Sequence, residues 1–399
     1  MIYDVVVVGA GPTGSLAAKY VALNGAKVLL IEEHSSIGSP VECTGLLSTK
    51  AIYECDLSPS DSFILNKISS AYVYSPNGNF IDVQGKDIKA YVVSRKSFDQ
   101  TLTYEAIKSG VTLLLNTKLV DICSKNEYQH ILVIKNGTTK SIKTKIIIGA
   151  DGIKSNVAKL SGLGNVKKVL SGIQIETQYM SRCPDHVELF LGSCAPGFFA
   201  WTVPINEKLS RIGLAIDSNS DINALEYLNN FCEQNSTIKG NRIGSVLDLS
   251  VGCIPLGTLK STVSHRTLIV GDAAGQVKPT SGGGIYPGAV CAKIAGEVAA
   301  NAALNNNLAN NHLIQYETKW RKSIGKELDI GFRFRKISNN FSDNDWNEII
   351  SALNNDKVRD IITEYGDIDH PSVLMKKLIS LKTSSSLIKL LKVFTRNIR

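Results

Sequence analysis

The sequence contains no long apolar run. Among its 399 residues, no stretch approaches the roughly 18 uninterrupted apolar residues that mark a transmembrane helix. The first strand-like run already begins at residue 2, so we expect no signal peptide. Both features predict a cytoplasmic protein.

Cysteine occurs eight times but never in a metal-binding spacing. The cysteines lie far apart, with no Cys-x-x-Cys pair and no Cys/His arrangement typical of zinc sites. We therefore expect no metal site and no iron–sulfur cluster. Most of these residues are interpreted as small buried apolar side chains.

Acidic residues are missing from the end of the chain. The formal net charge is +8, and residues 370–399 contain seven Lys and Arg residues but no Asp or Glu. The remainder is therefore nearly neutral, which argues against a nucleic-acid-binding surface on the folded body. The seven cations are Lys376, Lys377, Lys382, Lys389, Lys392, Arg396 and Arg399.

Apolar residues alternate with these cations between residues 387 and 399. This pattern predicts an amphipathic helix that makes peripheral contact with anionic lipid on the inner face of the cell membrane. A helix docked on the protein body, with its lysines in solvent, fits the same pattern.

The first 32 residues carry a dinucleotide-binding pattern. A β-branched apolar run at 2–8 leads into Gly-Ala-Gly-Pro-Thr-Gly, a helix-like stretch to Asn24 and a second apolar run that ends at Glu32. The order is strand, Gly-x-Gly-x-x-Gly, helix, strand, acid. An ordinary tight strand-to-helix turn is the alternative for an isolated glycine motif.

Each residue type in this pattern has a physical reason. Gly9 permits a tight turn after the strand, Gly11 lets backbone N–H groups approach a pyrophosphate, and Gly14 lets the helix pack close to the sheet. The Glu32 carboxylate can accept both hydroxyls of an adenosine ribose but would repel a 2′-phosphate. The pattern therefore predicts FAD or NAD rather than NADP.

The rest of the chain predicts a β-rich unit inserted into the nucleotide-binding one. With 399 residues, 43% of them hydrophobic, two or three packed domains are expected. Residues 68–83 alternate around a Pro-Asn-Gly turn, which predicts a β-hairpin, and residues 167–253 are mostly strand-like. A small-residue helix is expected at 286–304, and the remaining residues are helical in pattern.

Two further motifs follow predicted strands. Asp151 and Gly152 come after the strand at 145–148, Asp272 follows the strand at 267–270, and a glycine run at 282–284 precedes the long helix. Together with the glycine motif they resemble the FAD-dependent aromatic hydroxylase superfamily over roughly residues 1–305. The resemblance implies an α/β fold: a glutathione-reductase-like FAD-binding Rossmann domain with an inserted β-sheet substrate domain and a C-terminal helical region.

The resemblance also implies domain boundaries. The FAD-binding domain would comprise residues 1–67, 91–166 and 264–305. The substrate domain would comprise 68–90 and 167–263, and the C-terminal helical region 306–399.

The same resemblance implies roles in FAD binding. Asp272 would bind a ribityl hydroxyl, Arg95 would lie near the pyrophosphate, and the 282–284 glycines would offer N–H groups to the flavin. Arg95 as a surface residue and Asp151 as a helix cap are the alternatives. The implied cofactor residues are Gly9, Gly11, Thr13, Gly14, Glu32, Glu33, Cys43, Gly45, Arg95, Asp151, Gly152, Asp272, Gly283, Gly284 and Ile285.

Two stretches resemble the archaeal geranylgeranyl reductases. Residues 38–46 are similar to the family's cysteine loop, and residues 196–204 to its P-x-x-Y-x-W-x-F-P motif, with Phe199 replacing Tyr and Val203 replacing Phe. The lost phenol implies a changed chain-length preference or headgroup handling. The resemblance implies that the substrate contacts Phe199, Trp201 and Pro204.

The implied reaction reduces C=C bonds of digeranylgeranylglycerophospholipid, using a hydride from flavin N5 and a proton. Cys43 would deliver the proton or shape the flavin pocket, and the rings of Phe198, Phe199 and Trp201 would stabilise positive charge. A β-sheet core cluster is the alternative for the rings, and a buried small residue for Cys43.

Two other functions fit the cofactor pattern: an FAD-dependent monooxygenase and an FAD electron-transfer module for membrane quinone. The missing four-cysteine cluster argues against the second. The sequence shows no second dinucleotide motif, so ferredoxin, a deazaflavin or NAD(P)H would reduce the flavin directly or by docking.

Overall fold

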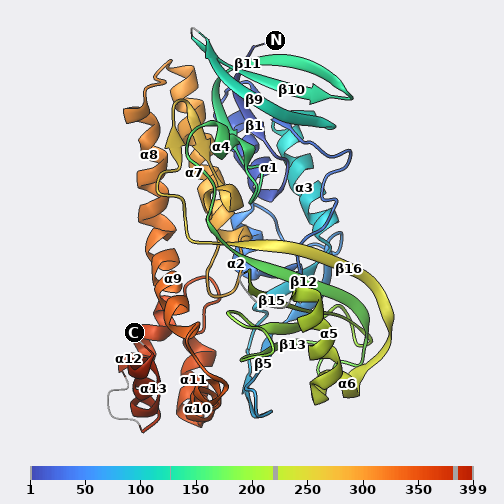
Figure 1. Cartoon of the computed structure of the whole chain (residues 1–399). Helices are drawn as coiled ribbons and strands as arrows, with labels where there is room; N and C mark the ends of the chain where they lie inside the picture. Colours follow the sequence, from blue (N-terminus) through green and yellow to red (C-terminus); the bar gives the residue numbers. More distant parts are fainter. Residues whose placement is uncertain (1, 126, 219–222, 381–384, 398–399) are drawn as a thin grey trace.

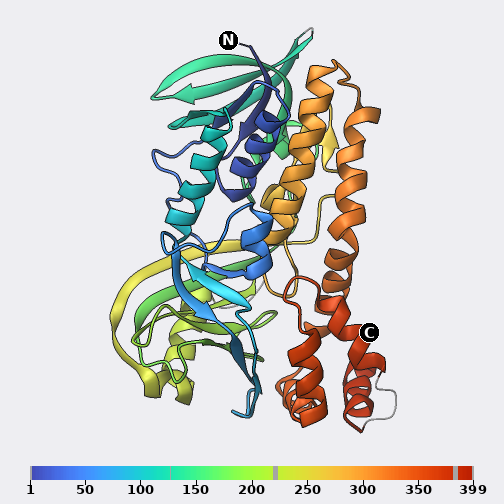
Figure 2. The same cartoon turned by 180° about the vertical axis from the view of Figure 1, so that it is seen from behind.

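The computed structural model describes residues 2–125, 127–218, 223–380 and 385–397. In Figure 1 an eight-stranded sheet occupies the upper part of the molecule and a seven-stranded sheet the lower right. Helices α7 to α9 run down the other side to the C-terminal helices, and Figure 2 shows the same arrangement from behind.

Five parallel strands form the centre of the eight-stranded sheet. Their order is β8-β2-β1-β11-β18, which in chain order is 3-2-1-4-5. This is the strand order of a Rossmann fold and confirms the predicted α/β nucleotide-binding unit. The eight strands are β1 (Ile2–Val8), β2 (Val28–Ile31), β8 (Thr112–Leu114), β9 (Thr117–Lys125), β10 (Tyr128–Lys135), β11 (Thr138–Gly149), β17 (Val263–Ser264) and β18 (Thr267–Ile269).

Small residues bring two helices close together on one side of this sheet. Helix α1 (Pro12–Leu23) begins with a proline, which the first helical turn tolerates. It packs on α7 (Ile285–Leu304), where a Cβ added to Gly296 would lie 2.7 Å from the carbonyl oxygen of Ala17. Helices α3 (Arg95–Lys108) and α4 (Asn156–Leu160) complete this unit.

The seven-stranded sheet combines two segments that lie far apart in the sequence. The predicted hairpin, formed by β5 and β6, joins the other strands through parallel pairing of β5 with β13. Helices α5 (Ala224–Gln234) and α6 (Ser236–Asn241) contact this sheet. Its order is β16 (Arg242–Leu256), β12 (Lys168–Tyr179), β15 (Leu209–Asp217), β14 (Ala200–Pro204), β13 (His186–Phe190), β5 (Ser70–Tyr74) and β6 (Phe80–Val83).

A third sheet, which the sequence did not predict, connects the two larger ones. It consists of β3 (Leu46–Ser48), β7 (Ala90–Val93) and β4 (Ile64–Ile68), and α2 (Thr49–Glu54) follows β3. Strands β4 and β7 run across the expected junctions at 67/68 and 90/91. These two junctions thus fall inside strands of the small sheet, and the domain boundaries as a whole stay a prediction.

The C-terminal region is helical, as the pattern predicted. No helix of the described residues is long and apolar enough to cross a bilayer. The helices are α8 (Asn310–Trp320), a π-helical turn at Arg321–Gly325, α9 (Lys326–Ser338), α10 (Asp343–Leu353), α11 (Asp356–Tyr365), α12 (Pro371–Ser380) and α13 (Ser385–Arg396).

Helix α13 is docked on the body of the protein. Val393 is fully buried, the Phe394 ring packs 5.3 Å from that of Phe341, and the Arg396 Nε donates to the Asp345 carboxylate at 2.7 Å. For Val393 and Phe394, which belong to the predicted lipid-facing stripe, the alternative of a helix docked on the protein body therefore applies. Val393 and Phe394 pack on the protein and are not free to enter lipid.

Another part of α13 faces solvent. Leu391 and Lys392 are exposed. Of the seven Lys and Arg residues in the segment 370–399, Lys382 and Arg399 lie outside the described residues.

Candidate active site

The glycine loop connects β1 to α1 where the strand order of the sheet reverses. Gly9 has φ +96°, and a Cβ there would lie 2.5 Å from the carbonyl oxygen of Ala150, at the end of β11. A Cβ at Gly14 would lie 1.8 Å from the Gly9 carbonyl oxygen. A Cβ at Gly11 would meet nothing within 4 Å. The first and third glycines are thus needed for packing, and the second leaves open space at the N-terminus of α1.

The two adjacent glutamates have different surroundings. One carboxylate oxygen of Glu32 accepts from the Ala10 N–H at 2.8 Å and the other from the His34 N–H at 3.0 Å. Glu33 instead forms an ion pair with Lys118 at 2.8 Å, and its side chain is 47% exposed. Glu32 therefore lies against the glycine loop, as predicted, whereas Glu33 lies in a surface ion pair.

Thr13 brings the first and last motifs together. A Cβ at Gly271, the first residue of the 3₁₀ turn η1 (Gly271–Ala274), would lie 2.9 Å from the Thr13 Oγ1. A Cβ at Gly288 in α7 would lie 2.6 Å from the same atom. Elements far apart in the sequence thus meet at one hydroxyl. The role of Gly288 was missed because a lone glycine within a helical pattern carries no local signal.

Asp272 lies beside the N-terminus of α7. A Cβ at Gly284, the N-cap of α7, would lie 2.8 Å from the Asp272 Oδ1. The Asp272 side chain is exposed to solvent and makes no hydrogen bond to a described residue. Many protein atoms nonetheless surround its carboxylate, and this burial raises the pKa of Asp272 while the charge of Arg95 opposes that effect. A carboxylate with these properties suits a hydroxyl donor, as the FAD ribityl chain supplies.

Arg95 lies at the start of α3 and is not a surface residue. Its Nε and Nη2 donate to the two carboxylate oxygens of Asp99, each at 3.0 Å, and its side chain is 15% exposed. Burial alone would lower the pKa of Arg95, but Asp99 and Cys43 outweigh burial and raise it. The charge interaction with Cys43 shows that the cysteine loop lies close to Arg95.

The Asp151 carboxylate serves α4. It accepts from the Ser155 hydroxyl at 2.5 Å and from the Val157 N–H at 3.0 Å. Burial raises the pKa of Asp151 against these hydrogen bonds. The side chain therefore supports the N-terminus of α4, whose N-cap residue is Ser155 rather than Asp151, and only its backbone, next to Gly9, adjoins the glycine loop. Gly152 has φ +72° and continues the turn.

The glycine run before α7 forms a tight loop. Gly282 has φ +70°, and its N–H donates to the Lys278 carbonyl at 2.9 Å. A Cβ at Gly283 would lie 2.8 Å from the Lys278 Cε. No side chain caps the N-terminus of α7, which begins at Ile285. Its first N–H groups are therefore available to a flavin edge.

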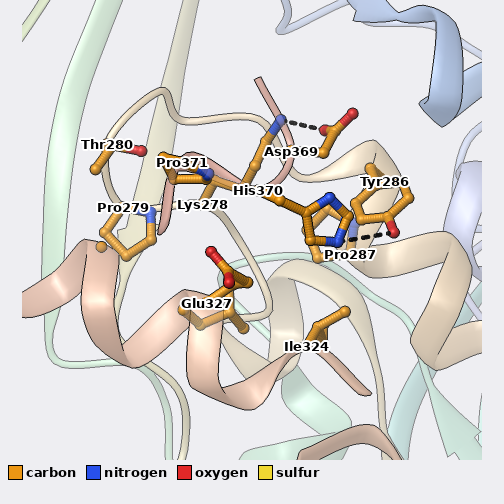
Figure 3. A pocket seen from close by; sticks show the side chains of 12 residues that line it. Lys278, Pro279, Thr280, Tyr286, Pro287, Ile324, Glu327, Asp369, His370 and Pro371 are labelled. Carbon is orange, nitrogen blue, oxygen red and sulfur yellow. Dashed lines mark hydrogen bonds and ion pairs between the residues drawn. The ribbon is translucent and has the colours of Figure 1, made fainter. Parts of the chain in front are cut away.

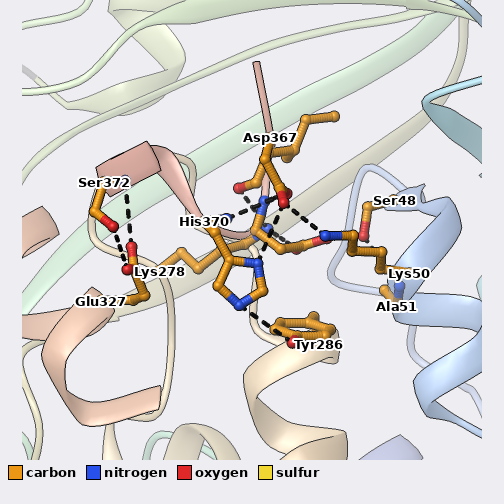
Figure 4. A network of polar contacts seen from close by, with 11 residues as sticks. Ser48, Lys50, Ala51, Lys278, Tyr286, Glu327, Asp367, His370 and Ser372 are labelled. Carbon is orange, nitrogen blue, oxygen red and sulfur yellow. Dashed lines mark hydrogen bonds and ion pairs between the residues drawn. The ribbon is translucent and has the colours of Figure 1, made fainter. Parts of the chain in front are cut away.

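Residues 366–372 fasten the C-terminal region to this loop, as Figures 3 and 4 show. The Lys278 Nζ pairs with the Asp369 carboxylate at 2.6 Å, and the His370 Nε2 lies 3.5 Å from the Tyr286 hydroxyl. The cavity among these side chains has a volume of about 10 Å³, room for about one water. It is too small for substrate, so this cluster has a structural role that the sequence did not reveal.

The cysteine loop lies on the face of the seven-stranded sheet that is turned toward the cofactor. The Cys43 carbonyl accepts from the Gln174 Nε2 at 3.2 Å, and the Thr44 carbonyl from the Arg211 Nη1 at 2.6 Å. The N–H of Gly45, which has φ +74°, donates to the Cys43 Sγ at 3.3 Å. Gln174 and Arg211 were missed because polar residues in strands far from the loop give no motif.

Three aromatic rings form a row on the same face. The rings of Phe198 and Phe199 are stacked with centroids 4.1 Å apart, and the Trp201 ring packs edge-on at 6.1 Å from Phe199. One end of the row meets the flavin-side loop, because a Cβ at Gly282 would lie 3.5 Å from the Phe198 Cζ. At the other end, a Cβ at Gly213 would lie 2.7 Å from the Trp201 ring and 2.6 Å from the Gln174 Cβ.

These rings also belong in part to the apolar core, which was the alternative interpretation. Phe198 and Trp201 pack against a buried cluster that contains Leu170, Ala215 and Leu256. The Trp201 Nε1 is buried and has no hydrogen-bond partner among the described residues. The row is thus one wall of an apolar layer rather than a free surface.

Pro204 is separated from the row. Side chains alternate along a strand, so Pro204 faces the opposite side of β14 from Trp201. Its carbonyl accepts from the Asn66 Nδ2 at 2.8 Å. Of the three implied substrate residues, the structure brings together Phe199 and Trp201 only.

Comparisons with known proteins identify the family of this chain. The FAD dependent oxidoreductase family matches residues 4–166. The chain is 34% identical to the digeranylgeranylglycerophospholipid reductase of Methanococcus aeolicus (88% of this chain, 90% of that one) and 35% identical to that of Methanocaldococcus jannaschii, with the same coverage. A geranylgeranyl bacteriochlorophyll reductase-like protein from Thermoplasma acidophilum superimposes with a TM-score of 0.86 at 26% identity, covering 98% of this chain and 99% of that one. The chain therefore belongs to the digeranylgeranylglycerophospholipid reductase family and is an FAD-dependent oxidoreductase.

Proposed function

We propose that this protein reduces C=C bonds of the geranylgeranyl chains in digeranylgeranylglycerophospholipid. The observation that carries the proposal is the position of the aromatic row. Phe198 adjoins the flavin-side loop at Gly282, and Trp201 adjoins Gln174, which binds the cysteine loop. An apolar chain lying along this row would pass between the cofactor loops and Cys43.

The residues around the proposed cofactor site fit FAD. The Gly11 turn leaves room for the pyrophosphate, Glu32 lies where the adenosine ribose is expected, and Asp272 offers a carboxylate with no hydrogen bond to any described residue. The N-terminus of α7 would face the flavin edge. Bound FAD, once reduced, supplies a hydride.

A trisubstituted alkene has no polarising group, so its reduction also needs a positioned proton donor and a dry site. We assign the proton to the Cys43 Sγ, which receives a hydrogen bond from the Gly45 N–H and lies close enough to Arg95 to interact with its charge. The rings of Phe199 and Trp201 exclude water and stabilise developing positive charge on the alkene through their faces.

Anaerobic turnover tests the proposal. The purified yellow protein would be reduced with dithionite and mixed with unsaturated ether lipid, and mass spectrometry would follow the lipid. We expect stepwise gains of two hydrogen atoms, together with reoxidation of the flavin. Reoxidation only by oxygen, with an oxygen atom added to a substrate, would instead identify a monooxygenase.

We further propose that the protein is cytoplasmic and contacts the membrane peripherally, and that ferredoxin, a deazaflavin or NAD(P)H reduces the flavin. The lipid substrate and the exposed Leu391 and Lys392 of α13 support membrane contact. Co-sedimentation with liposomes tests it: binding should rise with anionic lipid content and fall when residues 384–399 are deleted.

A further inference from the structure

Helix α9 presents a buried cation at one end of the aromatic row. The Arg335 guanidinium carbon lies 5.2 Å from the centroid of the Phe198 ring, and the residue is only 6% exposed. The order along this face is therefore Gln174, Trp201, Phe199, Phe198, Arg335. Aromatic side chains thus extend in a row from the cysteine loop to the Arg335 guanidinium.

This guanidinium has no hydrogen-bond partner among the described residues, and its Nη2 is fully buried. The nearby carboxylate of Asp217 attracts it electrostatically without hydrogen bonding to it. Gly197 adjoins both groups, since a Cβ there would lie 3.2 Å from the Asp217 Cβ and 3.7 Å from the Arg335 Nη2.

A buried charge without a hydrogen-bonded counter-ion is strongly unfavourable, so such groups normally pair with an anion. Burial lowers the pKa of Arg335 to about 10 against the effect of Asp217, which leaves the group cationic at neutral pH. A planar guanidinium is suited to bind two oxygens of a phosphate at once.

We propose that Arg335 binds the phosphate of the lipid substrate and thereby determines headgroup specificity. This inference rests on the proposed function, because it places one isoprenoid chain of the same substrate along the aromatic row. The phosphate at Arg335 fixes the lipid at one end, and the chain extends past Phe198, Phe199 and Trp201 toward Cys43.

The test compares Arg335→Gln with Arg333→Gln, which removes an exposed cation from the same helix. Steady-state rates would be measured on the phosphorylated ether lipid and on the same lipid lacking phosphate. For Arg335→Gln we expect KM for the phosphorylated lipid to rise roughly 10- to 100-fold, the loss of one strong hydrogen bond to a charged group. The kcat, the flavin content and KM for the neutral lipid should be unchanged, and Arg333→Gln should match wild type on both lipids.

Three results would overturn the proposal. The first is equal KM values for the two lipids in wild type, and the second is an equal loss on both lipids in Arg335→Gln. The third is stabilisation of wild type, but not of the variant, against thermal unfolding by inorganic phosphate, while wild type shows no preference between the two lipids. This result would assign the site to a free anion. If Arg335→Gln does not fold, Arg335→Lys keeps the charge but loses the planar fork, and we expect it to show an intermediate KM.

A binding measurement separates this inference from the proposed function. A saturated phosphorylated ether lipid cannot be reduced, so its affinity reports the phosphate site without turnover. Weaker binding to Arg335→Gln, with unchanged binding of the saturated neutral lipid, supports the site even if no alkene is reduced. Turnover of the neutral lipid with equal binding by both proteins supports the function and removes the phosphate site.

Discussion

The cofactor half and the substrate half of the active site are built in different ways. Most of the cofactor half comes from turns at the ends of adjacent parallel strands, so a short local motif describes each part of it. The substrate half joins the cysteine loop, three strands of a second sheet and a C-terminal helix. A Rossmann sheet brings its loops to one edge by topology, whereas the substrate half depends on how two sheets and a helix pack.

The largest expected effect is on the melting temperature, and it distinguishes a glycine needed for packing from one that faces the proposed cofactor. Gly14→Ala should prevent stable folding or greatly lower the melting temperature, because its Cβ would lie 1.8 Å from the Gly9 carbonyl oxygen. Gly11→Ala is the matched variant, since its Cβ meets no protein atom. We expect it to keep the apoprotein melting temperature and to lose FAD affinity. Equal melting temperatures for both variants would contradict this division.

The next effect concerns the proton. Cys43→Ser should slow alkene-driven reoxidation of the flavin by roughly 10²-fold, the scale of a lost general acid. Lipid binding should change little, because the Gln174 side chain binds the Cys43 carbonyl and a serine oxygen can still accept from the Gly45 N–H. Stopped-flow flavin absorbance measures the rate, and a wild-type rate in Cys43→Ser would remove the thiol from the chemistry.

The next prediction compares two neighbouring carboxylates, Glu32 and Glu33, in FAD binding. Glu32→Arg should weaken FAD binding by about 1.5–3 kcal/mol, because a charged acceptor beside the Ala10 N–H becomes a donor. Glu33→Gln should bind FAD like wild type, since Glu33 pairs with Lys118 at the surface. Titration of the apoprotein with FAD decides the matter, and equal losses in both variants would contradict the assignment.

Trp201 tests whether the row acts on substrate or only as core. In the substrate role, Trp201→Ala lowers turnover about tenfold through poorer positioning of the alkene, with normal FAD content and flavin reduction. In the core role, truncation costs roughly 3–5 kcal/mol of folding free energy and releases FAD. Melting temperature, flavin occupancy and lipid turnover should be measured on the same preparation. We expect the first pattern.

The smallest effect concerns how α8 is attached to the nucleotide-binding unit. Burial alone would raise the pKa of Glu317, but hydrogen bonds from Thr262, Arg321 and Ser261 outweigh it and lower the pKa. Stability from this group is therefore present above the unfolded pKa near 4.5 and is lost as pH falls through the lower folded value. The melting temperature should fall less steeply below pH 4.5 in Glu317→Gln than in wild type.

The sequence by itself determined the nucleotide-binding unit and the inserted hairpin, and it predicted the cofactor residues. Gly9, Gly14 and Asp272 could be found because each depends on backbone conformation or position at a strand end, which a few neighbouring residues define. The same local signals do not reveal the ion pair of Glu33, whose partner Lys118 lies elsewhere in the chain.

Tertiary structure alone decided which distant residues meet. Gln174, Arg211 and Arg335 sit in ordinary strand or helix patterns, and only the packing of the second sheet and α9 brings them to the cysteine loop and the aromatic row. It also placed Pro204 on the other face of its strand and docked α13 through Val393. Periodicity identifies an apolar face, but whether a second element or lipid covers that face depends on contacts that no local pattern records.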